Sequence, residues 1–270
     1  MRVRGLSPVD VPRALDLVNS RPFSHGFLAS LLETRRLTSL VGVFADSELL
    51  AISTTGGNCT STDLTPETAA VLASYLALEG RRAASIVGSQ RNVRLLWDAL
   101  DGRWGSARMI REAQPFLALD HLPDIEMDPQ VRRGALSEID IIFPACVHMF
   151  TAEVGTSPIA NGMEVAYRER IEGIIRDGRS FVRIVDGVLE FKTEIGATSS
   201  MSCQFQGVWV APQFRGTGLA APAVAAVAAI ALAEVAPAVQ LYVNDFNLPA
   251  LRTYQRVGFR QVDTFSTVFF

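Results

Sequence analysis

The alternation of apolar and polar positions predicts short strands and amphipathic helices in turn over the first half of the chain. Thr65 followed by Pro66 fits the N-cap and first position of a helix that runs to Glu79. A turn is predicted at Asp46–Ser47, between two apolar runs. The other elements expected here are the strands Val3–Leu6, Leu40–Phe44, Leu49–Thr54, Ala84–Val87 and Gln114–Leu119 and the helices Val11–Asn19, His25–Arg35 and Arg91–Leu100.

The second half of the chain repeats this order of elements. The stretch RRGALSEIDIIFPACVHMF at 132–150 echoes RVRGLSPVDVPRALDLV at 2–18, which predicts a duplicated unit. The link is expected at Leu122–Arg133, where two prolines lie among mixed charges, so we expect two domains, 1–125 and 130–270. The later elements expected are the helices Val165–Asp177, Pro222–Val235 and Leu248–Val257 and the strands FVRIVDG, VLEFKTEIGA, FQGVWVAP, VQLYVN and TFSTVFF.

Composition narrows the class of protein. Hydrophobic residues make up 49% of the 270, enough for buried cores, and a net charge of −3 leaves no basic surface for nucleic acid. Cys59, Cys146 and Cys203 are widely spaced and odd in number, which predicts buried thiols in a reducing, cytoplasmic compartment. The three histidines lack metal-ligand spacing, so no metal is expected, and no signal-peptide pattern opens the chain.

The segment Leu219–Val239 is long and apolar enough to raise the question of a membrane span. Glu234 interrupts the segment, however, and Pro222 and Pro237 lie near its ends. Alanine, which dominates it, is only weakly lipophilic. A helix buried against a sheet is therefore predicted, and no membrane partner is expected.

The stretch WVAPQFRGTGLAAP at 209–222 places two glycines and an arginine where a strand passes into a helix. A helix N-terminus offers unpaired N–H groups, and glycines let an anion approach them, although a plain flexible loop is the simpler interpretation. The string GTGLAA also fits a dinucleotide fingerprint. That reading is disfavoured because Ala211–Arg215 separates it from the strand and only 25 residues follow Asp245.

The pattern Gln213-x-x-Gly216-x-Gly218 resembles the pyrophosphate loop of the acyl-CoA-dependent N-acetyltransferases, the GNAT superfamily. The piece NLPALRTYQRVGF, which begins at Asn247, matches the family motif N-x-x-A-x-x-x-Y-x-x-x-G-F. The resemblance covers residues 132–270. Within it, VWVAPQFRGTGLAAP, FKTEIGA and LYVNDFN are similar to a group of actinobacterial two-part proteins with an uncharacterised region before the GNAT module.

This resemblance implies an α/β (α+β) fold of tandem GNAT-like modules, each a mixed, mostly antiparallel sheet flanked by helices. It also implies acetyl-CoA as the acyl-donor co-substrate, with its pantetheine arm paired to an exposed strand backbone. Arg215 would add charged donors, Thr217 a hydroxyl, and Asn247 a contact to CoA or a helix cap. The expected CoA contacts are Val208, Trp209, Val210, Gln213, Arg215, Gly216, Thr217, Gly218, Leu219, Ala220 and Asn247.

The N-terminal half lacks these features. Its counterpart of the glycine loop, GGNCTSTDLTPE, has two glycines but no comparable spacing, and only Trp97 or Asp98 loosely matches Tyr254. We interpret this half as a degenerate module that shapes the acceptor cleft or stiffens the protein.

Tyr254 is the expected general acid, because the resemblance places it beside the CoA sulfur. A phenol has a pKa near 10, close to that of the departing thiol, so proton transfer is nearly matched. The alternative is a core tyrosine packed on a sheet.

The general base is less clear from the sequence. Gln204 and Gln206 occupy the strand where many relatives carry a glutamate, and neither is a useful base. Glu194 is the nearest strand carboxylate, and alternation puts it on the same face as Lys192. It is either the base or part of an exposed charged face, or a water chain serves instead. Glu153 is expected to bind the cationic acceptor amine.

The predicted function is acyl-CoA-dependent N-acyl transfer (EC 2.3.1.-), with an acetyl donor and direct attack by an amine in a ternary complex. The acceptor is a small molecule or a protein, and a homodimer is compatible with these features. Two alternatives are an aminoacyl or longer-acyl transferase on the tandem scaffold and a non-catalytic, CoA-responsive binding protein.

Overall fold

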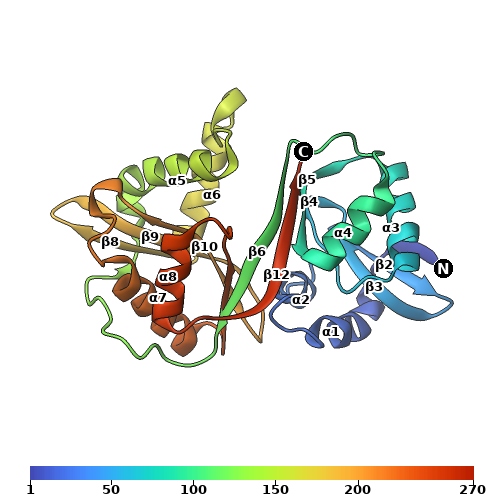
Figure 1. Ribbon diagram of the computed structural model, residues 1–270, viewed down its shortest axis with the longest axis horizontal. Coiled ribbons are helices and arrows are strands. Elements are labelled where there is room, and N and C mark those ends of the chain that lie inside the picture. The colour runs from blue at the N-terminus through green and yellow to red at the C-terminus, as the bar shows by residue number, and fades with distance from the viewer.

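The computed structural model describes residues 1–270 as two halves with the same order of elements (Figure 1). The first half contains β1 (Arg2–Gly5), α1 (Val11–Asn19), α2 (Gly26–Glu33), β2 (Leu40–Ala45), β3 (Glu48–Thr54), β4 (Gly56–Cys59), α3 (Pro66–Glu79), β5 (Arg82–Ser89), α4 (Gln90–Leu100) and β6 (Met109–Leu119). The second contains β7 (Arg132–Arg133), α5 (Ile139–Val154), α6 (Glu164–Arg176), β8 (Ser180–Val185), β9 (Val188–Thr198), β10 (Cys203–Val210), α7 (Ala220–Glu234), β11 (Val239–Tyr242), α8 (Leu248–Val257) and β12 (Arg260–Phe269). The predicted fold class is confirmed.

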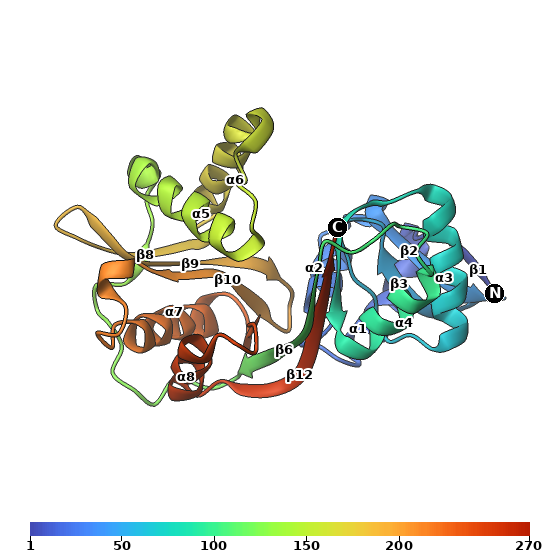
Figure 2. The same ribbon diagram turned by 45° about the horizontal axis from the view of Figure 1, so that its top comes forward.

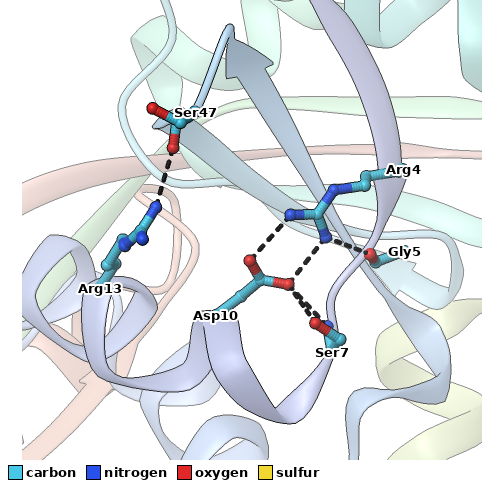
Figure 3. Close-up of polar contacts among 6 residues, drawn as sticks. All are labelled: Arg4, Gly5, Ser7, Asp10, Arg13 and Ser47. Carbon is cyan, nitrogen blue, oxygen red and sulfur yellow. Dashed lines mark hydrogen bonds and ion pairs between the residues drawn. The ribbon is translucent and has the colours of Figure 1, made fainter.

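The same polar contact closes the first strand-to-helix connection in both halves. Arg4 donates two hydrogen bonds to Asp10, at 2.7 and 2.8 Å, and the Ser7 backbone N–H donates a third at 2.9 Å (Figure 3). In the second half, Arg132 donates to Glu138 at 2.9 and 2.6 Å, and the backbone N–H three residues before Glu138 donates at 2.8 Å. The echo in the sequence is therefore also an echo in local structure.

Nine strands from both halves form one mixed sheet, in the order β4-β5-β12-β6-β11-β10-β9-β8-β7, while β1, β2 and β3 form a separate sheet. The last strand of each half pairs with strands of the other half. Strand β12 of the second half lies between β5 and β6 of the first, and β6 also pairs with β11 of the second. Figure 1 shows β6 and β12 running side by side between the halves. The two halves are therefore joined through a continuous sheet.

Helices cover both faces of the sheet in the second half. In Figure 2, α5 and α6 lie above β8, β9 and β10, and α7 and α8 lie below them. The alanine and valine side chains of α7 are buried in the largest hydrophobic cluster, together with sheet residues such as Phe191 and Phe205. This burial confirms the predicted role of the apolar segment. None of the helices has both the length and the apolar character needed to cross a membrane.

Helix α2 connects the two halves through close packing. A Cβ atom on Gly26 would lie 2.4 Å from Nε2 of Gln240 and 2.8 Å from Oγ of Ser202, so a larger residue here would displace these side chains. Ser200 donates to the Glu33 carboxylate from its backbone N–H at 2.8 Å and from its hydroxyl at 2.7 Å. These contacts fix α2 against the end of the β9–β10 hairpin.

Candidate active site

The glycine-containing connection between β10 and α7 has an open anion-binding geometry. Gly216 and Gly218 have φ values of 78° and 89°, a backbone region that favours glycine. The backbone N–H groups of Gly216 to Leu219 donate to no protein acceptor, and no side chain caps α7. Free N–H groups at the positive end of a 15-residue helix suit a phosphate.

The side chains of this connection are mostly engaged within it. Arg215 donates through Nε to the Val210 carbonyl at 3.1 Å, and the Thr217 hydroxyl donates to the Phe214 carbonyl at 2.8 Å. The hydroxyl that the sequence suggested as an extra phosphate donor thus stabilises the loop itself. The donors left for an anion are the backbone N–H groups and the Nη groups of the exposed Arg215 guanidinium.

Strands β10 and β11 separate soon after they meet. They form parallel pairs only at Cys203–Val239 and Gln204–Gln240, after which β10 stays with β9 and β11 with β6. A bulge at Gly207, with φ of 64°, adds to the divergence. The later part of β10, which includes the predicted stretch Val208–Val210, therefore has a backbone edge that β11 does not pair. Such an edge can bind an amide-bearing chain as an added strand.

The three side chains of Val208–Val210 point to different faces. Val208 and Val210 pack against the hydrophobic cluster under α7. Trp209 packs on the α5 and α6 side, with its ring centroid 6.3 Å from that of His148 and its buried Nε1 without a partner. Backbone atoms, rather than these side chains, are thus what this strand offers at its open edge.

Asn247 and Tyr254 occupy the start and the last turn of α8. Oδ1 of Asn247 accepts from the Ala250 backbone N–H at 3.3 Å, so the capping role is confirmed. Tyr254 is 6% exposed, and its ring centroid lies 5.7 Å from that of Phe259. Burial, together with the negative charge of Glu153, raises the pKa of the Tyr254 phenol, which therefore stays protonated at neutral pH.

Glu194 does not belong to an exposed charged face. It is 4% exposed and Lys192 is fully buried, because α5 covers this face of β9. Nζ of Lys192 lies 2.5 Å from Oε1 of Glu194 and 3.1 Å from Sγ of Cys146. The Gln206 side-chain amide donates to the second carboxylate oxygen at 3.4 Å. The alternation of the strand placed Lys192 and Glu194 together correctly, but only packing decided that they are buried.

The ion pair controls the basicity of Glu194. Burial alone would raise the pKa of this carboxyl, but the charge and hydrogen bond of Lys192 outweigh burial and hold the pKa below its ordinary value. The pKa of Lys192 is raised in turn, despite the burial that opposes it. Both groups are therefore charged at neutral pH, and Glu194 is a carboxylate of reduced basicity.

A cavity of about 1160 Å³ lies beside this pair and includes residues from both halves of the chain. Glu194, Gln206 and Glu153 all line the cavity, which brings together the predicted base and the predicted amine-binding residue. Oε1 of Glu153 lies 3.7 Å from Nη1 of Arg111, and Nη2 of Arg111 donates to the Glu153 backbone carbonyl. Tyr242 lines the cavity too, and burial raises its pKa to about 12.

Tyr254 and Glu194 lie on opposite faces of the sheet. Tyr254 belongs to the hydrophobic cluster under α7, whereas Glu194 contacts Cys146 of α5. The divergence of β10 from β11 opens the sheet between these two faces. Tyr254 is not among the residues that line the cavity beside Glu194.

The corresponding region of the N-terminal half is closed. Thr65 caps α3 by accepting from the Thr68 backbone N–H at 3.2 Å, which removes a donor that an anion would need. All four residues of β4 pair with β5, so no free edge remains between them. These features agree with the interpretation of this half as degenerate.

Sequence reasoning missed several residues of this region. Cys146 and Tyr167 reach it from α5 and α6, and Arg111 reaches it from β6 of the other half. No local pattern marks them, because their proximity depends on how helices and strands pack. Lys192 did carry a signal, since it lies two residues before Glu194 on one strand.

Comparisons with known proteins agree with this geometry. Residues 179–259 match the Acetyltransferase (GNAT) family, and residues 38–142 match a domain of unknown function, DUF4081. No curated protein sequence is significantly similar to the chain.

Solved structures resemble the whole chain at low sequence identity. An acetyltransferase of the GNAT family from Colwellia psychrerythraea is 13% identical, with a TM-score of 0.60 over 100% of both chains. A GCN5-related N-acetyltransferase from Sphaerobacter thermophilus is 16% identical, with a TM-score of 0.65 over 98% of this chain and 93% of the other. A tandem GNAT protein from the clavulanic acid biosynthesis pathway is 13% identical, with a TM-score of 0.58 over 99% and 98%. The chain therefore contains a GNAT acetyltransferase domain at residues 179–259 and has the fold of tandem GNAT proteins.

Proposed function

We propose that the protein is an acyl-CoA-dependent N-acyltransferase that uses acetyl-CoA as donor and an amine as acceptor. The observation that carries the proposal is the run of free N–H groups from Gly216 to Leu219 next to the unpaired edge of β10. The first feature suits a pyrophosphate and the second suits the amides of the pantetheine arm. Together they would direct the thioester into the opening between β10 and β11.

The reaction forms one bond and breaks one. The neutral amine nitrogen attacks the thioester carbonyl carbon, the N–C bond forms, and the C–S bond breaks to release the thiolate of CoA. The amine loses a proton, and the thiolate gains one. Tyr254 is the proposed donor to the thiolate, because it is protonated at neutral pH and belongs to the hydrophobic cluster against which Val208 and Val210 of β10 pack. Its raised pKa makes it a weaker acid than an ordinary phenol, so its match to the departing thiol is poorer than the sequence suggested.

Glu194 is the proposed acceptor for the amine proton, either directly or through one water molecule. It lines the cavity that the acceptor would enter and is ionised at neutral pH. The ion pair with Lys192 weakens it as a base, so a relay to solvent is the alternative route. Glu153 lines the same cavity, and its carboxylate would attract a cationic amine before deprotonation.

Replacement of both loop glycines tests the donor site. Gly216→Leu/Gly218→Leu should weaken acetyl-CoA binding at least about 100-fold in a calorimetric titration, because side chains and strained backbone would remove hydrogen bonds to a charged group. The matched control is Gly102→Leu/Gly187→Leu, which replaces two other glycines of positive φ in open surroundings. The control should bind normally. A folded loop variant with unchanged affinity would show that the site is elsewhere.

A further inference from the structure

The cavity that contains Glu194 is larger than a small amine requires. Its volume of about 1160 Å³ exceeds the roughly 300–1,000 Å³ typical of small-molecule sites. Each of the seven neighbouring strands from β9 to β4 contributes lining residues. Six strand spacings of about 4.8 Å give a length of roughly 29 Å across the sheet. These lining residues describe a long groove across the sheet. Figure 2 shows how the shared sheet connects the two halves.

The floor of the groove combines aromatic rings with amide side chains. Phe116 and Phe265 stack with centroids 4.1 Å apart, and Tyr242 lies 5.6 Å from Phe265. Gln204 and Gln240 are paired neighbours on β10 and β11 and both line the groove. Gln240 is 2% exposed, and its Oε1 has no hydrogen-bond partner. An amide N–H of a bound chain would supply the donor that this buried oxygen lacks.

One face of α2 forms part of the wall. Phe27, Ser30, Leu31 and Thr34 have helical i, i+3, i+4 and i+7 spacing and all line the groove. The hydrogen bonds from Ser200 to Glu33 attach this helix to the second half. The N-terminal half thus contributes a fixed wall at a site whose chemical groups come from the other half.

Charges in the groove are unbalanced. Arg36 and Arg108 line it without an acidic partner, the charge of Arg170 acts on the Glu194 carboxylate, and Glu169 is the one lining acid without a basic partner. The remaining charges form the pairs Glu153–Arg111, Asp177–Arg179 and Glu194–Lys192. The excess of guanidinium groups favours an acceptor with negative charges away from its amine.

We propose that the acceptor is an extended, acidic polypeptide segment whose amine lies at Glu194 and whose chain crosses the sheet towards β4. An extended chain covers 3.3–3.6 Å per residue, so a groove of roughly 29 Å holds about eight residues. The peptide N–H and C=O groups match the amide side chains of the floor, and acidic side chains match the unpaired arginines. This assignment rests on the proposed acyl transfer and gives the N-terminal half the task of recognising the acceptor.

Degenerate peptide libraries test the assignment with the full-length protein and acetyl-CoA. Two octapeptide libraries would each carry a free N-terminus and one lysine, with Asp and Glu at fixed positions in one and Asn and Gln in the other. Dipeptides, glucosamine and spermidine serve as small amines, and release of the CoA thiol is measured. The acidic octapeptides should give kcat/KM at least about tenfold above the neutral octapeptides and the small amines. Small amines that match the octapeptides would overturn the assignment.

Charge reversal at Arg36 tests the place of binding. Arg36→Glu should lower kcat/KM for acidic octapeptides about tenfold at low salt, and the loss should shrink at high salt because ions screen the interaction. Arg35→Glu is the matched control, since Arg35 is also exposed but does not line the groove. Equal losses in both variants would contradict the proposed location. If acetyl-CoA binds but no amine of any kind releases thiol, the proposed function fails, whereas turnover of small amines alone contradicts only the peptide acceptor.

Discussion

At the scale of single residues, Tyr254 combines a buried ring with a hydroxyl that stays protonated because its pKa is raised. Tyr254→Phe should keep the packing on Phe259 and remove only the hydroxyl. We expect kcat to fall by roughly 10²–10⁴-fold, the usual contribution of a general acid, with little change in acetyl-CoA affinity. Steady-state kinetics and calorimetry separate the two quantities. A normal kcat would mean that the thiolate leaves without this proton.

Glu194 gives a prediction about pH. Because Lys192 lowers its pKa, a base at Glu194 should produce an ascending limb of kcat below the ordinary glutamate pKa. Glu194→Gln should remove that limb and lower kcat by roughly 10²–10⁴-fold. Lys192→Met should move the limb to higher pH, whereas Lys192→Arg, which keeps the charge, should move it less.

The pH profiles of these variants distinguish the base from a water relay. In a water relay, Glu194→Gln would lower kcat only slightly, and the ascending limb of the pH profile would follow the pKa of the acceptor amine. Loss of one partner of a buried pair also destabilises a protein by about 3–5 kcal/mol, so folding of Lys192→Met must be checked by circular dichroism. Lys192→Arg keeps the prediction testable if that variant does not fold.

At the scale of elements, the β1–α1 connection depends on the Asp10 carboxylate. Hydrogen bonds from Arg4 chiefly lower its pKa, burial opposes them, and bonds from Ser7 assist. A lowered pKa in the folded state means that the stabilisation is present above the ordinary value near 4 and is lost as the pH falls below it. Asp10→Asn should lower the free energy of unfolding by about 2 kcal/mol at pH 7, measured by urea unfolding. The difference from the natural protein should shrink below pH 4.

Arg13 provides the control for this measurement. It lies beside the same cluster in Figure 3 and donates to the Ser47 carbonyl at 2.8 Å, but its contact is exposed. Arg13→Gln should change the free energy of unfolding by less than about 0.5 kcal/mol at any of these pH values. A pH-independent loss in Asp10→Asn would contradict the assigned role of the carboxylate.

Secondary structure followed from the sequence where local signals were strong. The helices Val11–Asn19, Pro66–Glu79 and Leu248–Val257 were predicted to the residue, because caps, prolines and apolar spacing mark their ends. Strand β4 was not predicted, since Gly56 and Gly57 have low strand propensity. It exists because β5 pairs with it, which is a tertiary contact.

At the scale of the whole molecule, the two halves share their sheet by exchange of their last strands. The sequence places β6 in the first half and β12 in the second, yet β6 pairs with β11 and β12 pairs with β5. This exchange brings Arg111 of β6 to Glu153 of α5, and Phe265 of β12 to Phe116 of β6. The long groove across the sheet is a consequence, because its floor uses strands of both halves.

The sequence by itself determined most of the order of elements, with β4 as an exception, together with the duplicated plan and the glycine loop at Gly216 and Gly218. These features depend on local chemistry: which residues adopt positive φ, where a helix can begin, and which side chains share a strand face. The tertiary structure alone decided three others, namely the divergence of β10 from β11, the burial of the Lys192–Glu194 pair and the exchange of β6 and β12. Each depends on which distant segments pack together, and strand pairing and burial gain their free energy from those partners rather than from the local sequence.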